Sequence, residues 1–282
     1  MKHIRIASIV LVAVALAGTA GIAARPPELT RKVYFSAVDD AGAAVTDLTA
    51  ADLTVKEGGK DRPIAGVQPA TAPMHVAIFV DDAGTGAFQT GVSQFFGTAL
   101  GHARFAVSVM NPQPIKVVDY TADVDTLKAA IGRLGQRGRV IADGEQIVEA
   151  VGGAAKELQQ LQAGRPIIVV LTVRGETALS DMADTAMDNL KNSGASLHVL
   201  YITGNQLGKV LGDGPKQSGG TIQQASPGVP LAPVLVKMAE NLLHQYVLTY
   251  TLPDGVKPSD RFSLSTKRKG VKLFAPSRVP DK

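Results

Sequence analysis

The 282-residue sequence predicts an α/β fold in which a central, mostly parallel sheet with helices on both faces is inserted into a small β-sandwich formed by N- and C-terminal strands. Between residues 74 and 245, short apolar runs alternate with segments of helical periodicity, the pattern of parallel strands joined by crossover helices. The segments 28–70 and 246–276 instead show short strand-like runs separated by glycine turns. Two or three strands are not stable alone, so we expect the two end segments to pair with each other.

Residues 1–24 have the pattern of a secretory signal peptide. Lys2 and Arg5 precede an apolar run from Ile6 to Ala17, and small residues continue to Ala24. A retained membrane anchor is the alternative, because this uncharged stretch approaches the roughly 20 residues that span a bilayer. After cleavage we expect no membrane association and a periplasmic or secreted location in a bacterium.

Composition narrows the range of functions for the remaining chain. The sequence has no cysteine, which excludes disulfides, thiolate chemistry and a lipoprotein anchor. Without Lys2 and Arg5, 27 basic residues face 25 acidic ones, a balance too even to favour nucleic acid as a partner. The hydrophobic content of 45% with few aromatics and no tryptophan predicts an aliphatic α/β core.

The N-terminal segment, residues 28–70, is predicted to contain strands at 32–38, at 53–57 and from 63 towards 67. An Asp-Asp-Ala-Gly turn follows the first strand, and Gly58-Gly59 follows the second. The C-terminal segment is predicted to contain strands at 246–252, 261–266 and 271–274, which are the natural partners of the first set.

The middle segment, residues 74–245, is expected to form the α/β domain. The predicted strands are 75–80, 104–110, 115–120, 166–172 and 197–202. Apolar side chains at helical spacing predict helices over about 88–100, 123–134, 147–161, 182–192 and 231–242. The run 166–172 is the most apolar, so we place it beside strand 75–80 at the sheet centre. The short turn 111–114 predicts that strands 104–110 and 115–120 are antiparallel, and a glycine-rich segment, 204–220, precedes the last helix.

The central strand ends in a group of polar residues. His75–Val80 is followed by Asp81, Asp82 and then Gly84-Thr85-Gly86. In open α/β sheets, ligands bind at the carboxyl ends of the strands. Asp81, Asp82 and Thr85 are therefore the first candidate binding residues.

The ends of the chain resemble bacterial von Willebrand factor type A-related (VWFA-related) proteins. The resemblance spans about residues 30–275. It depends on Val38-Asp-Asp-Ala-Gly42, Val45-Thr-Asp-Leu48, Asp52-Leu-Thr-Val55 and Glu57-Gly-Gly-Lys60, and on the closing stretches Ser218-Gly-Gly220 and Glu240–Tyr250. It implies a Rossmann-like type A domain that binds partners rather than catalysing a reaction.

The resemblance also implies a position for a metal-ion-dependent adhesion site (MIDAS), and this chain departs from its pattern. The family's first loop, Asp-x-Ser-x-Ser, matches Asp81, Ala83 and Thr85, so one hydroxyl is missing. Val140 stands at or near the family's threonine on the second loop. The third loop has Val173-Arg174 after Thr172 where the family has Asp-Gly.

A hard cation takes about six oxygens, usually including carboxylates. With Asp82 or Asp143 as substitutes and Arg174 as a nearby cation, we expect a degenerate site with no metal or cofactor bound. This interpretation leaves room only for weak Mg²⁺, Mn²⁺ or Ca²⁺ binding. Asp81 is expected instead to cap the following helix or to pair with Arg174.

The motifs of two enzyme classes are incomplete in this sequence. Gly84-Thr-Gly86 lacks the third glycine of a dinucleotide-binding turn. Asp81-Asp-Ala-Gly-Thr85 resembles the nucleophile motif of haloacid-dehalogenase-like phosphatases, with Asp81 as the nucleophile, except that Ala83 replaces the general acid/base. The histidines show no ligand spacing, and no nucleophile elbow is present.

The sequence therefore predicts an exported, non-enzymatic protein–protein interaction module, with a protein partner that it does not name. The predicted binding face comprises the loops 81–87, 136–143, 173–180 and 204–218. The alternatives are a phosphatase using Asp81, a metal-dependent adhesion protein with an atypical ion site, and a type A domain that only displays the sandwich.

Overall fold

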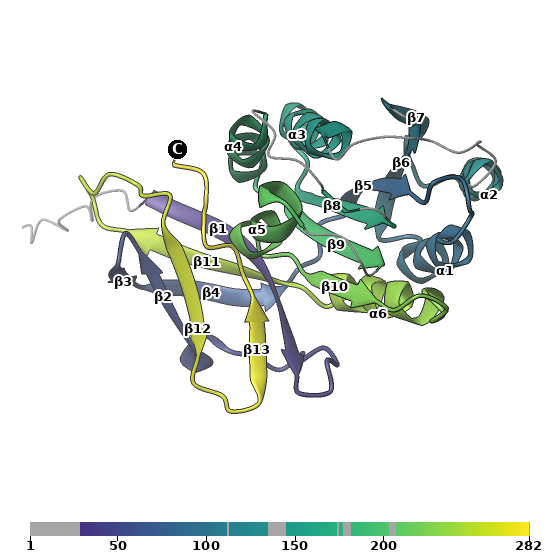
Figure 1. The fold of residues 1–282 in the computed structure, drawn as a ribbon. Coiled ribbons are helices and arrows are strands. Elements are labelled where there is room, and N and C mark those ends of the chain that lie inside the picture. Colours follow the sequence, from purple (N-terminus) through teal and green to yellow (C-terminus); the bar gives the residue numbers. More distant parts are fainter. Residues whose placement is uncertain are drawn as a thin grey trace, which may run out of the picture.

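The structure is a computed structural model that describes residues 29–111, 113–134, 145–173, 175–176, 182–202 and 207–281. It confirms the predicted fold class: a six-stranded, mostly parallel sheet is flanked by helices, and antiparallel sheets are built from the two ends of the chain (Figure 1). No helix in the described ranges is both long and apolar enough to cross a membrane.

The central sheet has the strand order β10-β9-β8-β5-β6-β7. Its strands are β5 (Met74–Asp81), β6 (Ala103–Asn111), β7 (Gln113–Thr121), β8 (Arg165–Thr172), β9 (Ser196–Ile202) and β10 (Ile222–Ala225). As predicted, β8 lies beside β5, with Asp81 opposite Thr172, and β6 and β7 are antiparallel. The other neighbouring pairs are parallel, so the carboxyl ends of β5, β8 and β9 meet at one edge.

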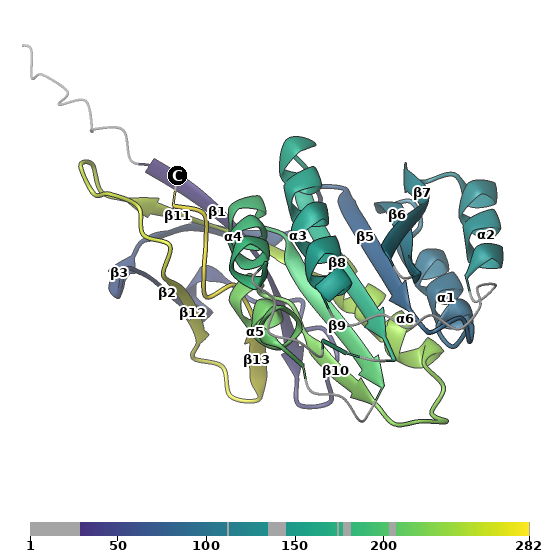
Figure 2. The same ribbon diagram turned by 45° about the horizontal axis from the view of Figure 1, so that its top comes forward.

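Helices cover both faces of this sheet (Figure 2). They are α1 (Gln89–Ala99), α2 (Val124–Arg133), α3 (Glu145–Gln160), α4 (Ala183–Ser193), α5 (Lys209–Ser218) and α6 (Ala232–Leu243). Because side chains alternate along a strand, β5 supplies two separate cores. Val76 and Ile78 pack with α1, α2 and α6, whereas Ala77 and Phe79 pack with α3, α4 and α5.

Helix boundaries follow local chemistry that the sequence predicts. Asp123 caps α2, its carboxylate accepting the backbone N–H of Thr126 at 2.8 Å. Gly194 ends α4 with a φ of 65°, a backbone conformation that suits glycine.

The two ends of the chain form one β unit, as predicted. Its strands are β1 (Leu29–Asp39), β2 (Leu53–Glu57), β3 (Lys60–Arg62), β4 (Ile64–Pro69), β11 (Tyr246–Leu252), β12 (Phe262–Thr266) and β13 (Val271–Phe274), with a 3₁₀ turn at Ala50–Asp52. They make a four-stranded sheet, β13-β1-β11-β4, and a three-stranded sheet, β12-β2-β3. The two sheets share a third core to which both contribute, for example Phe35 and Tyr250 from one and Val55 and Phe262 from the other.

The prediction that residues 204–218 form a loop is wrong for most of that segment. Residues 209–218 form α5, which packs on α4 and β9, and strand β10 follows at Ile222. Val210, Leu211, Gly214 and Pro215 are its buried residues, at helical spacing. Glycines and a proline inside the helix disfavour it intrinsically, and the packing of these residues overrides that preference.

Candidate functional site

Asp81 lies at the carboxyl end of β5, where the sequence places the site. Its side chain is 2% exposed, and Oδ2 accepts a hydrogen bond from the Thr172 hydroxyl at 2.9 Å. The same hydroxyl oxygen accepts the backbone N–H of Gly175 at 2.9 Å, and Val173 N–H donates to the Asp81 carbonyl. The register of β5 against β8 therefore brings the first and third loops together.

Asp82 closes the first loop on itself. Oδ1 accepts the N–H of Gly84 at 2.9 Å, and Oδ2 accepts the N–H of Gly86 at 2.8 Å. The Thr85 hydroxyl donates to the Asp82 carbonyl at 2.8 Å. We call residues 81–87, held in this way, the closed loop.

The backbone of the closed loop is unusual. Gly84 and Gly86 have φ values of 77° and 74°, and Ala83 has a φ of 54°. The left-handed region costs a residue with a Cβ about 1–2 kcal/mol. Strain of this kind persists only where neighbouring bonds determine the backbone, and here the Asp82 carboxylate supplies them.

The expected capping of the following helix by Asp81 is not observed. The N-cap position of α1 is Phe88, and no side chain caps this end. Asp82, rather than Asp81, satisfies the backbone N–H groups of the loop. The other half of that expectation, the pairing of Asp81 with Arg174, stays a prediction because Arg174 lies outside the described residues.

Within the described residues, the polar side chains of Asp82 and Thr85 in the first loop are turned to the loop's own backbone. No group of three or more His, Asp or Glu side chains gathers in the described part of the chain. Both Asp82 carboxylate oxygens accept backbone amides, and the Thr85 hydroxyl donates to a backbone carbonyl, so both side chains are held by the loop itself. A hard cation requires about six oxygens. Val140 and Asp143 also lie outside the described residues, as do loop 136–143 and residues 177–180, so their contribution stays a prediction.

Glu176 is a buried acid near the same edge that the sequence interpretation missed. It is 2% exposed, and its carboxylate accepts the N–H of Val210 at 3.3 Å and of Leu211 at 2.7 Å, in the first turn of α5. Burial raises the pKa of this carboxyl group. A Cβ on Gly208 would lie 2.4 Å from the Glu176 carboxylate, so glycine is required for this approach. Glu176 therefore joins the loop after β8 to the start of α5.

Comparisons with known proteins concern the fold. No family model matches the sequence, and no curated protein matches it. A solved structure described as von Willebrand factor type A from Catenulispora acidiphila is 11% identical, with a TM-score of 0.49 and coverage of 88% of this chain and 74% of that chain.

Two further solved structures are also similar. The VWA domain of SpRpn10 is 12% identical with a TM-score of 0.42, covering 59% of this chain and 94% of that one. The pilus adhesin SpaC from Lactobacillus rhamnosus GG is 11% identical with a TM-score of 0.46, covering 81% and 48%.

Proposed function

We propose that this chain is an exported, non-enzymatic protein–protein interaction module of the VWFA-related type, and that it works without a bound metal ion. The observation that carries this proposal is the closed loop. Its carboxylate and hydroxyl groups satisfy the loop's own backbone, so the loop keeps a defined shape without an ion.

The closed loop also offers a surface to a partner. Thr85 and Ala87 are exposed, whereas Asp81 and Asp82 beneath them are buried. A loop that is already held in one conformation loses little conformational entropy on binding, which favours affinity. A partner would therefore contact the crest of the loop rather than its carboxylates.

A partner-capture experiment tests the binding face. Crosslinking in the native cell envelope, followed by purification, should capture a partner with the wild-type chain and lose it with Thr85→Arg. The matched control is Ser263→Arg, which places the same side chain at an exposed position of β12 in the sandwich. Loss of the partner with Ser263→Arg but not with Thr85→Arg would show that the sandwich carries the binding.

Titration calorimetry tests the absence of a metal. Mg²⁺, Mn²⁺ and Ca²⁺ should each show no site tighter than the millimolar range. A micromolar site that disappears in Asp81→Ala would contradict the metal-free proposal and favour a metal-dependent adhesion protein.

Two further measurements test the remaining parts. Purified protein should not hydrolyse a phosphate ester such as p-nitrophenyl phosphate. Hydrolysis that is abolished by Asp81→Asn would overturn the non-enzymatic proposal. Mass spectrometry of the protein from fractionated cells should find a new N-terminus after Ala23 or Ala24 in the periplasm or medium. An intact N-terminus in the membrane fraction would contradict cleavage and favour the retained anchor.

A further inference from the structure

A cavity of about 240 Å³ lies at the opposite end of the central sheet from the closed loop. Its lining includes Arg165 and Ser196, the first residues of β8 and β9, together with Lys32 of β1. The cavity therefore lies where the sheet meets the sandwich. It is not part of the binding face proposed above, which lies at the carboxyl ends of the strands.

One wall of the cavity is the C-terminal segment 276–280, which we call the strap. Gln217 at the end of α5 accepts the N–H groups of Ser277 and Arg278 at 3.0 and 3.1 Å, and Val279 N–H donates to Asp260 at 2.9 Å. The strap is thus bonded to the α/β unit on one side and to the sandwich on the other.

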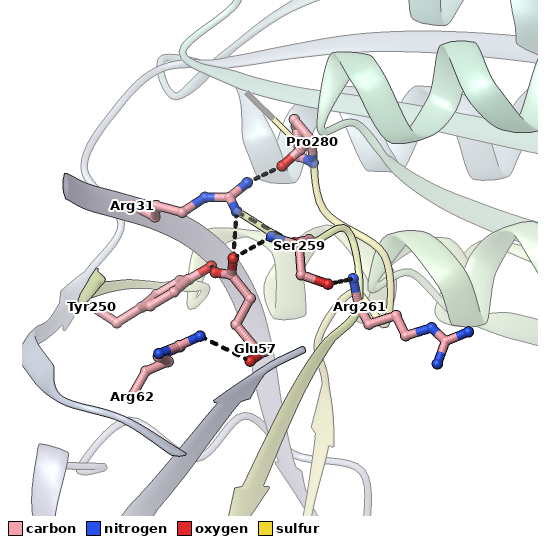
Figure 3. Close-up of polar contacts among 7 residues, drawn as sticks. All are labelled: Arg31, Glu57, Arg62, Tyr250, Ser259, Arg261 and Pro280. Carbon is pink, nitrogen blue, oxygen red and sulfur yellow. Dashed lines mark hydrogen bonds and ion pairs between the residues drawn. The ribbon is translucent and has the colours of Figure 1, made fainter. Parts of the chain in front are cut away.

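A buried polar cluster fixes the end of the strap (Figure 3). The Arg31 guanidinium donates to the carbonyl of Pro280 and, at 3.0 Å, to Glu57 Oε1. Glu57 is fully buried, and its carboxylate also accepts from Ser259 N–H at 2.7 Å and from the Tyr250 hydroxyl at 2.6 Å. Because each of these groups is bonded, the cavity wall is preformed rather than assembled on binding.

The cavity is positively charged. Four of the described lining residues are cationic, and none is acidic: Lys32, Arg165, Lys191 and Arg278. Two of the four are paired with carboxylates outside the lining, Lys191 with Asp188 at 3.7 Å and Arg278 with Asp260 at 2.5 Å. No ion pair within the described residues compensates Lys32 or Arg165.

Arg165 is the central member of this set. It is 4% exposed, and its terminal nitrogens donate to the carbonyls of Ala70, Ala72 and Leu242. Its Nε has no hydrogen-bond partner in the described structure. Burial lowers the pKa of this guanidinium to about 10, so it remains charged at neutral pH. No carboxylate among the described residues balances this positive charge, which lies at the wall of the cavity.

The rest of the lining is suited to an apolar body with one further polar group. Met187, Leu190 and Val279 contribute apolar surface. Gln245, which is 2% exposed, also lies in the lining. This apolar surface favours an anion with an organic body over inorganic phosphate or sulfate.

We propose that this cavity binds a small organic carboxylate, with its charge compensated by Arg165 and Lys32 and its apolar body against Met187, Leu190 and Val279. The volume corresponds to about eight waters at their liquid volume, so the ligand is of the size of a six- to nine-carbon acid. The attraction between a carboxylate and an arginine side chain is strong where both groups are removed from water.

Calorimetry with hexanoate and 3-phenylpropionate on the full mature chain tests this inference. We expect saturable binding of at least one acid, and no binding of hexanamide, which keeps the shape and loses the charge. Lys32→Glu should weaken binding about tenfold, because an attraction becomes a repulsion of similar size. Lys60→Glu is the matched control: Lys60 is an exposed lysine of β3 that does not line the cavity, and its reversal should change the affinity less than twofold.

Several outcomes would overturn the inference. They are binding of neither acid, equal binding of hexanamide, binding of sulfate in place of the acids, or equal effects of Lys32→Glu and Lys60→Glu. Circular dichroism of each variant shows whether the fold is kept. Arg165 is not the variant of choice, because its carbonyl contacts also hold the fold. The proposed function and this inference fail separately, since Thr85→Arg should leave acid binding unchanged.

Discussion

Glu57 offers a sharp test of how the sandwich is held together. Its carboxylate is fully buried and accepts three hydrogen bonds, from Arg31 at 3.0 Å, Ser259 N–H at 2.7 Å and the Tyr250 hydroxyl at 2.6 Å. In Glu57→Leu all three donors lose their acceptor, and Arg31, itself 9% exposed, loses its ion partner. Breaking one side of a buried ion pair costs about 3–5 kcal/mol. That is a large part of the roughly 5–15 kcal/mol that stabilises a folded domain.

Urea unfolding followed by circular dichroism measures this loss as a fall in the unfolding midpoint. Arg31→Leu should also be strongly destabilising, but the double variant should cost at least about 1 kcal/mol less than the sum of the single losses, because neither charge is then left unpaired. Asp61→Ala is the control: it removes an exposed pair with Lys56 at 3.7 Å and should change stability by about 0.5 kcal/mol or less. A Glu57→Leu loss below about 1 kcal/mol, or strict additivity with Arg31→Leu, would refute the reasoning.

Three further predictions concern buried polar groups. Arg165→Gln should lower the free energy of unfolding by about 2–4 kcal/mol in urea denaturation, because backbone carbonyls lose a charged donor. Burial lowers the pKa of His198 to about 4, so the folded chain keeps the ring neutral while the unfolded chain takes up a proton below pH 6.5. The free energy of unfolding should therefore fall by at most about 3 kcal/mol between pH 6.5 and pH 4. It should fall less steeply with pH in His198→Gln, and equal slopes for the two proteins would contradict this. Gly208→Ala should cost about 1–3 kcal/mol by displacing Glu176, and should cost clearly less when measured in a Glu176→Ala background.

The architecture could be predicted because buried strands and helices show characteristic patterns of apolar residues in the sequence. The near-continuous apolar runs of β5 and β8 reflect strands covered on both faces, and their pairing follows from that shared property. The pairing of β1 with β11 across about 200 residues followed from a simpler requirement, since neither end segment could bury its strands alone.

The hydrogen bonds of the candidate site do not show as a pattern in the sequence. The sequence identified Asp81 and Asp82, but the roles it assigned depended on which oxygen meets which backbone N–H, and that is decided by the turn at Ala83. Glu176 is not evident from the sequence because its partners are the backbone amides of Val210 and Leu211. These two N–H groups point together out of the first turn of α5 only when that helix forms. The α5 helix itself was hidden by Pro215 and its glycines, which intrinsic propensity assigns to a loop.

The two neighbouring aspartates raise a question of charge that bears on the metal. Asp81 and Asp82 are 2% and 6% exposed, and a buried carboxylate is costly unless hydrogen bonds or an opposite charge compensate it. In a metal site the cation supplies that compensation. Here the N–H groups of Gly84 and Gly86 meet one carboxylate, and the hydroxyl of Thr172 meets the other. The strained turn at Ala83 is what brings both amides to the same side chain, so the loop conformation and the electrostatic compensation are one feature. Backbone amides thus compensate the Asp82 carboxylate, which supports proposing a binding face that functions without an ion.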